Sequence, residues 1–127
     1  MAVEGIGGLF FRARDPAALK AWYRDRLGIG AGLATPGAGA AEPYVWTVGG
    51  GSLVFEPFAE TTEYFPVDRQ YMLNLRVSGL SGMVVDLAAH GITAETRPEW
   101  DSPETGCFAR IHDPEGNPIE LWEPPAD

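Results

Sequence analysis

The sequence predicts one α+β domain over residues 1–127, built from two tandem βαβββ modules that form a curled mixed sheet with a cleft. Two observations lead to this prediction. Strand-like and helix-like segments follow one another as β-α-β-β-β, a linker, and β-α-β-β-β. Similar residues also recur at a constant spacing in the two halves, as expected of an internal repeat. We place module one at about 4–57, the linker at 58–69 and module two at about 70–123.

The first module opens with a predicted strand and a helix. Residues 5–14 alternate weakly between apolar and polar types, which favours a strand. Asp15 and Pro16 then indicate a helix start, because aspartate caps helix N-termini and proline suits the first helical position. Apolar residues at helical spacing continue this helix to Gly28, which fits its end. The Gly/Ala/Pro-rich stretch 30–43 predicts a mobile loop with a short strand.

A hairpin completes module one, and module two repeats the order. The predicted strands of the hairpin are 44–48 and 52–56, joined by three glycines. In module two we expect a strand at 71–77, a helix at 81–91, a short strand at 92–97, a loop at 98–106 and two final strands. These last strands flank Asp113–Gly116, a tight turn in which proline pre-sets φ and glycine accepts a positive φ.

The repeat has an offset of 64 residues. It relates Gly8 to Met72, Arg12 to Arg76, and Glu56 to Glu120. A competing offset of 67 pairs the segments 55–57 and 122–124, but only the offset of 64 also aligns the opening strands.

Alternation along the predicted strands separates an apolar face, packed under the helices, from a polar face. The apolar set is Leu9, Phe11, Ala13, Leu53, Phe55, Leu73, Leu75, Val77, Ile119 and Leu121. The second set is Gly8, Phe10, Arg12, Ser52, Val54, Glu56, Met72, Asn74, Arg76, Pro118, Glu120 and Trp122. A polar floor with an apolar rim is typical of a small-molecule site. Trp46, near the 30–43 loop, and Arg110 complete the candidate ligand-binding residues.

The composition narrows the classes of partner. The net charge is -9 with a single lysine, so the chain lacks the basic surface that nucleic acid or an anionic membrane requires. Such an acidic surface serves solubility or attracts a cationic small molecule. The chain has neither a long apolar run nor a secretory signal, and its one cysteine, Cys107, excludes an internal disulfide. We therefore expect a cytoplasmic protein.

Two stretches, RARDPAALKAWYRDRLGI (12–29) and DPEGNPIELWEP (113–124), resemble the vicinal oxygen chelate superfamily. This superfamily includes glyoxalase I, bleomycin resistance proteins and extradiol dioxygenases. The resemblance covers essentially the whole chain and implies paired βαβββ modules around a cleft, usually in a homodimer. It does not imply one reaction, because members include isomerases, dioxygenases and binding proteins.

Enzymes of this superfamily hold a divalent metal through one residue from each of four strands. In glyoxalase I-like members these are a histidine and a glutamate from each module, and the matching positions here are Gly8, Glu56, Met72 and Glu120. Both carboxylates are present and both histidines are missing. Glycine offers no ligand, and a thioether prefers soft metals, so we expect no cofactor, or at most a weakly bound divalent metal on Glu56 and Glu120.

The arginines on the polar face allow a different arrangement. Arg12 and Arg76 are related by the repeat, and guanidinium groups bridge carboxylates, so these residues and Glu56 and Glu120 are predicted to form an ion-pair network in place of the metal. Two alternatives remain: a weak metal site, or neither a metal site nor an ion-pair network. By the family resemblance, Arg12 is also a candidate clamp for an anionic substrate.

Two functions follow from these residues. The first is a small-molecule binding protein of the bleomycin resistance kind, with an acidic cleft and no tightly held metal. The alternative is a lyase or isomerase of glyoxalase I-like (lactoylglutathione lyase-like) type, or a dioxygenase relative, with Glu56 or Glu120 as a catalytic base.

Overall fold

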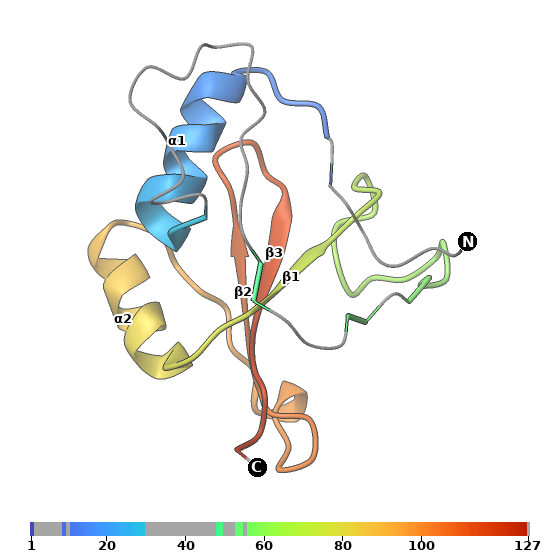
Figure 1. Ribbon diagram of the computed structural model, residues 1–127. Coiled ribbons are helices and arrows are strands. Elements are labelled where there is room, and N and C mark those ends of the chain that lie inside the picture. Colours follow the sequence, from blue (N-terminus) through green and yellow to red (C-terminus); the bar gives the residue numbers. More distant parts are fainter. Residues whose placement is uncertain (2–8, 10, 30–47, 50–52, 55, 127) are drawn as a thin grey trace.

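The computed structural model describes Met1, Leu9 and residues 11–29, 48–49, 53–54 and 56–126 (Figure 1). In chain order its elements are α1 (Pro16–Leu27), β1 (Leu73–Arg76), α2 (Leu80–Ala89), the 3-10 helix η1 (Pro98–Trp100), β2 (Cys107–His112) and β3 (Pro118–Glu123). None of the helices in these ranges is long and apolar enough to cross a membrane.

The three strands form a mixed sheet in the order β1-β3-β2. Strand β3 lies in the centre, parallel to β1 and antiparallel to β2. The register places Asn74 beside Glu120 on one side of β3, and Arg110 opposite Glu120 on the other. Residues on these three strands with the same parity therefore share one face of the sheet.

The strand predicted at 92–97 is too long. In the structure only Glu95 pairs, forming a bridge with Arg110 through two backbone hydrogen bonds of 2.8 Å. The N–H of Ile92 instead donates to the carbonyl of Leu87 at the end of α2, and Pro98 begins η1, so little chain remains to pair. From β1 to β3 the order is therefore strand, helix, bridge, strand, strand.

Helix α1 begins and ends as the sequence predicts, whereas α2 spans Leu80–Ala89 instead of the predicted 81–91. The Asp15 carboxylate accepts a hydrogen bond from the N–H of Ala18, and Gly28 ends α1 with a φ of 70°. Helix α2 is capped from outside its own segment. The Glu123 carboxylate, at the end of β3, accepts from the N–H of Gly79 at 2.6 Å, where a negative charge also suits the helix dipole.

Both helices lie on one side of the sheet, and the hydrophobic core fills the space between (Figure 1). Its buried residues are Leu19, Tyr23, Leu75, Leu80, Leu87, Ala109, Ile111, Ile119 and Leu121. Ile119 and Leu121 are fully buried, so their predicted place on the helix-facing side is confirmed. Each such side chain contributes about 1.5–3 kcal/mol by leaving water.

The first predicted module is not confirmed. Its opening strand (5–14) and hairpin (44–56) fall largely outside the described residues, and the described positions within them are not in strands. Phe11 is half exposed, but its ring contacts Tyr23 of α1 edge to face at 6.4 Å between ring centres. The expected packing of Leu9 and Leu53 under a helix is wrong, because these side chains are 51% and 62% exposed. The described part of the chain gives them no paired strand that would orient them toward the core. The tandem arrangement stays a prediction.

The predicted turn after β2 is confirmed and is stabilised by the buried carboxylate of Asp113. This carboxylate accepts hydrogen bonds from the N–H groups of Glu115 and Asn117 at 2.8 and 3.0 Å, and from the Asn117 side chain at 2.7 Å. The hydroxyl of Tyr23 in α1 donates a fourth, at 2.8 Å. Burial and this bond to Asp113 raise the pKa of Tyr23 far above its ordinary value. The turn is thus fixed to helix α1.

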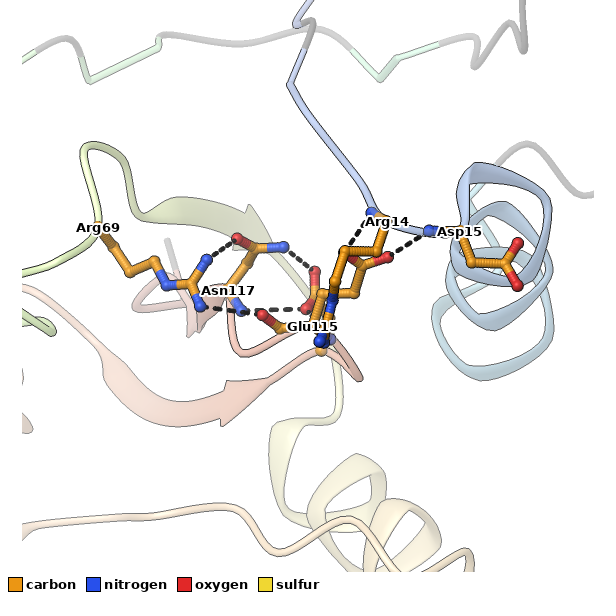
Figure 2. A network of polar contacts seen from close by, with 6 residues as sticks. Arg14, Asp15, Arg69, Glu115 and Asn117 are labelled. Carbon is orange, nitrogen blue, oxygen red and sulfur yellow. Dashed lines mark hydrogen bonds and ion pairs between the residues drawn. The ribbon is translucent and has the colours of Figure 1, made fainter.

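Figure 2 shows how the same turn also holds the approach to α1 and the linker. The Glu115 carboxylate accepts from the backbone N–H groups of Arg14 and Asp15 at 2.7 and 3.1 Å. The guanidinium of Arg69 donates to the Glu115 carbonyl at 3.0 Å and to the Asn117 side chain at 3.2 Å. Segments far apart in the sequence therefore meet at residues 113–117.

Gly106, just before β2, leaves no room for a side chain. Its φ is +100°, and an added Cβ would lie 2.2 Å from the carbonyl oxygen of Glu123. We expect Gly106→Ala to lower the free energy of unfolding by more than about 1 kcal/mol in urea denaturation. Gly82→Ala is the matched control, because Gly82 lies in α2 with nothing within 4 Å, and it should raise stability by about 0.5–1 kcal/mol. Equal effects of the two substitutions would contradict this account.

Glu115 should make stability depend on acid pH. The N–H groups of Arg14, and then of Asp15, hold the pKa of the Glu115 carboxyl below its ordinary value. The unfolded chain therefore takes up the proton first as pH falls, so the stabilisation is present at neutral pH and is lost as pH falls through the lowered pKa. Urea midpoints of Glu115→Gln should lie below those of the wild type at neutral pH and converge with them in acid. Glu99→Gln, at an exposed position, should show no such convergence.

Candidate functional site

A buried glutamate lies on the sheet face opposite the helices. Glu120, in the centre of β3, is 6% exposed. Its Oε1 accepts a hydrogen bond from the side-chain amide of Asn74 at 2.8 Å, and its Oε2 accepts one from the hydroxyl of Tyr64. Asn74 comes from the adjacent strand β1, whereas Tyr64 comes from the segment that precedes it. The predicted sharing of one face by Asn74 and Glu120 is confirmed.

The charge opposite Glu120 belongs to Arg110 of β2. Arg110 is also 6% exposed, and its Nη2 lies 3.9 Å from Oε2 of Glu120. Its Nη1 donates to the backbone carbonyl of Tyr64 at 2.8 Å. The guanidinium lies 4.9 Å from the Tyr64 ring centre and 5.6 Å from that of Trp100, within the range of cation–π attraction. The buried carboxylate and the buried guanidinium thus compensate each other's charge.

Part of the Arg110 guanidinium has no hydrogen-bond partner among the described residues. Both Nε and Nη2 are buried, and neither donates to a protein acceptor there. A buried donor left in this state destabilises a fold by about 1–3 kcal/mol. Native proteins rarely keep such groups without a structural or functional reason.

Two aromatic rings, of Tyr64 and Trp100, lie over the guanidinium of this pair. Tyr64 contacts Trp100 edge to face at 6.1 Å between ring centres, and Phe58 contacts Tyr64 at 5.7 Å. Farther along the same sheet face, the rings of Phe108 and Trp122 stack with an interplanar angle of 12°. The Trp122 indole N–H donates to the carbonyl of Thr105 at 2.7 Å, which fixes that ring. The site therefore combines an apolar surround with one buried ion pair, as ligand sites commonly do.

The surroundings also change the acidity of Tyr64. Burial, and then the hydrogen bond to Glu120, raise the pKa of Tyr64 to about 12, although the nearby guanidinium of Arg110 opposes the rise. The phenol therefore stays protonated at neutral pH and acts as a donor to Glu120.

A family model described as a glyoxalase-like domain matches residues 8–122 of the chain. The chain belongs to this glyoxalase-like domain family. Because the family is part of the vicinal oxygen chelate superfamily, the resemblance noted in the sequence is confirmed. No curated protein matches the chain.

The structure of this glyoxalase-like protein brings together three predicted site residues, Asn74, Arg110 and Glu120. Three others share or adjoin their face. Arg76 and Trp122 do so by strand register, and Met72 directly precedes β1. Three more, Gly8, Phe10 and Trp46, lie outside the described residues.

Two predicted residues are placed elsewhere. Glu56 is exposed, and the described contacts of Glu120 do not include it. Arg12 lines an open groove of about 470 Å³ with Arg14, Arg69 and Glu115, next to the 113–117 turn.

The predicted ion-pair network therefore needs correction. It assigned Arg12 and Arg76 to Glu120, whereas the arginine that contacts Glu120 is Arg110. The physical reason is strand pairing. Arg110 is directly opposite Glu120 in the β2–β3 hairpin, where side chains are neighbours, whereas the repeat offset identifies equivalent positions and not adjacent ones.

The described residues do not fit the metal site of glyoxalase I-like enzymes. No three His, Cys, Asp or Glu side chains in the described ranges lie close enough to share an ion. Glu120 already accepts from Asn74 and Tyr64, and the Arg110 guanidinium places a positive charge beside it. At the second histidine position, Met72 offers only a soft thioether.

Tyr64 and Trp100 were missed from the sequence. Tyr64 lies in the predicted linker and Trp100 in a predicted loop, where no strand or helix periodicity assigns a side chain to a face. The aromatic content of residues 58–65, which is high for a solvated linker, could have indicated that this segment packs on the rest of the protein.

The raised pKa of Tyr64 gives a test of these contacts. The unfolded chain loses its phenolic proton near pH 10, before the folded chain does. The stabilisation is therefore complete below about pH 10 and is lost as pH rises toward about 12. Tyr64→Phe should lower the free energy of unfolding at neutral pH by about 1 kcal/mol, and its stability should fall less over this alkaline interval. Tyr71→Phe is the control, because Tyr71 is exposed and should behave like the wild type.

Proposed function

We propose that this glyoxalase-like protein binds a small molecule on the sheet face that bears Glu120, Arg110 and Trp122, without a tightly held metal. The observation that supports this function is the buried Glu120–Arg110 pair, with two aromatic rings over its guanidinium, where the resemblance places a metal ligand of the superfamily's enzymes. A fixed ion pair orients a ligand through charge and hydrogen bonds, and the rings supply apolar contact. The homodimer and the cytoplasmic location expected from the sequence remain part of the proposal.

The alternative is an enzyme of glyoxalase I-like or related type that uses Glu56 or Glu120 with a weakly bound divalent metal. A catalytic base needs a carboxylate with an accessible lone pair and room for the substrate proton. Glu120 is buried, both of its oxygens accept hydrogen bonds, and a guanidinium lies beside it. These contacts favour a fixed charge over proton transfer, which is why binding is the better supported function.

A thermal-shift screen tests the proposal. Ligands that bind only the folded state raise its melting temperature, and we expect at least one class of small molecule to do so. Binding should weaken by more than about tenfold in Glu120→Gln, because the buried ion pair that orients the ligand is broken. Glu104→Gln, at an exposed position, should bind as the wild type does.

The same screen on EDTA-treated protein separates the two functions. Shifts that survive EDTA support metal-independent binding. Shifts that vanish with EDTA and return with Mn, Ni, Zn or Fe would replace it with the metal-dependent alternative. If no compound class shifts the melting temperature, the binding proposal is wrong.

A further inference from the structure

The unpartnered donors of Arg110 lie on one edge of its guanidinium. In arginine the Nε–H and one N–H of Nη2 point in parallel from the same edge, and these are the two nitrogens of Arg110 without an acceptor among the described residues. Two parallel donors match the spacing of the two oxygens of a carboxylate. The remaining terminal nitrogen, Nη1, is held by the carbonyl of Tyr64.

We propose that this edge of Arg110 binds a carboxylate of the ligand, so that the site selects small aromatic carboxylates. The inference rests on the proposed binding function and specifies its ligand class. An anionic ligand differs from the cationic ligand that the net charge of the chain suggests. At a buried site, the local arrangement of donors determines what binds, and the overall charge does not.

Glu120 leaves this edge available to a ligand. Its Oε2 lies 3.9 Å from Nη2, beyond hydrogen-bond distance, and accepts from Tyr64 instead. Its Oε1 accepts from Asn74. Glu120 therefore stabilises the guanidinium by charge at close range, while its hydrogen bonds are made with other groups.

The rings around Arg110 favour an aromatic ligand. Tyr64 and Trp100 lie on the guanidinium, and both are only partly buried, so they reach from the donor edge to the surface. A flat ring that enters beside them keeps the aromatic contacts they make with each other and with Arg110. Because Nε and Nη2 are themselves buried, a ligand carboxylate reaches them only when a side chain that covers them moves aside.

Three probes of one shape and different charge test this inference: benzoate, benzamide and benzamidine. In calorimetric or NMR titrations of the full chain we expect benzoate to bind at least about tenfold more tightly than the other two. On binding, the Nε–H signal of Arg110 should shift. Arg110→Lys keeps the charge but lacks the paired donors, and should weaken benzoate binding by at least about tenfold. Arg26→Lys, at an exposed position in α1, should leave it unchanged.

Several results would overturn the inference. These are benzamide or benzamidine binding as tightly as benzoate, an unchanged affinity in Arg110→Lys, or no benzoate binding at millimolar concentration. If Arg110→Lys does not fold, the comparison of probes and the Nε–H signal in the wild type decide the question. A ligand from the thermal-shift screen that lacks a carboxylate but requires Glu120 would leave the proposed function standing and reject this ligand class.

Discussion

The register of the β2–β3 hairpin is the constraint on which the rest of the structure depends, and the Asp113 carboxylate fixes it. By accepting four hydrogen bonds at the turn, Asp113 sets His112 opposite Pro118 and therefore Arg110 opposite Glu120. A slip of one residue in either strand would exchange its two faces. The core would then receive the charged side chains, and the ion pair would be lost.

The central strand β3 serves both faces of the sheet. Ile119 and Leu121 close the core under the helices, and Glu120 between them has its donors on the other side. Glu123, at the end of the same strand, caps helix α2. By the resemblance, the position of Glu120 matches a metal ligand of the superfamily's enzymes. In this structure a guanidinium opposite it on the neighbouring strand supplies positive charge beside the buried carboxylate.

Local signals in the sequence were sufficient for much of the fold. The ends of α1, the turn at Asp113 and the alternation of β3 depend on neighbouring residues, and they were predicted correctly. Arg110, the partner of Glu120, was not predicted. The internal repeat relates equivalent positions and gives no information about which strands pair. Counting outward from the turn would have identified Arg110. Tyr64 could not be placed at all, since its position depends on tertiary contacts made by a segment without periodicity.

The contacts of Tyr64 have a consequence for dissecting the protein. The segment before β1 reads as a spacer between two repeated halves, yet its tyrosine bonds to both members of the ion pair. A fragment that begins at β1 would contain the three strands of the sheet, but it would lack Tyr64, which contacts both members of the charged pair. The predicted boundary between the two modules is therefore not a boundary of the site. Chimeras joined within 58–69 would need to keep this tyrosine at its present distance from β1.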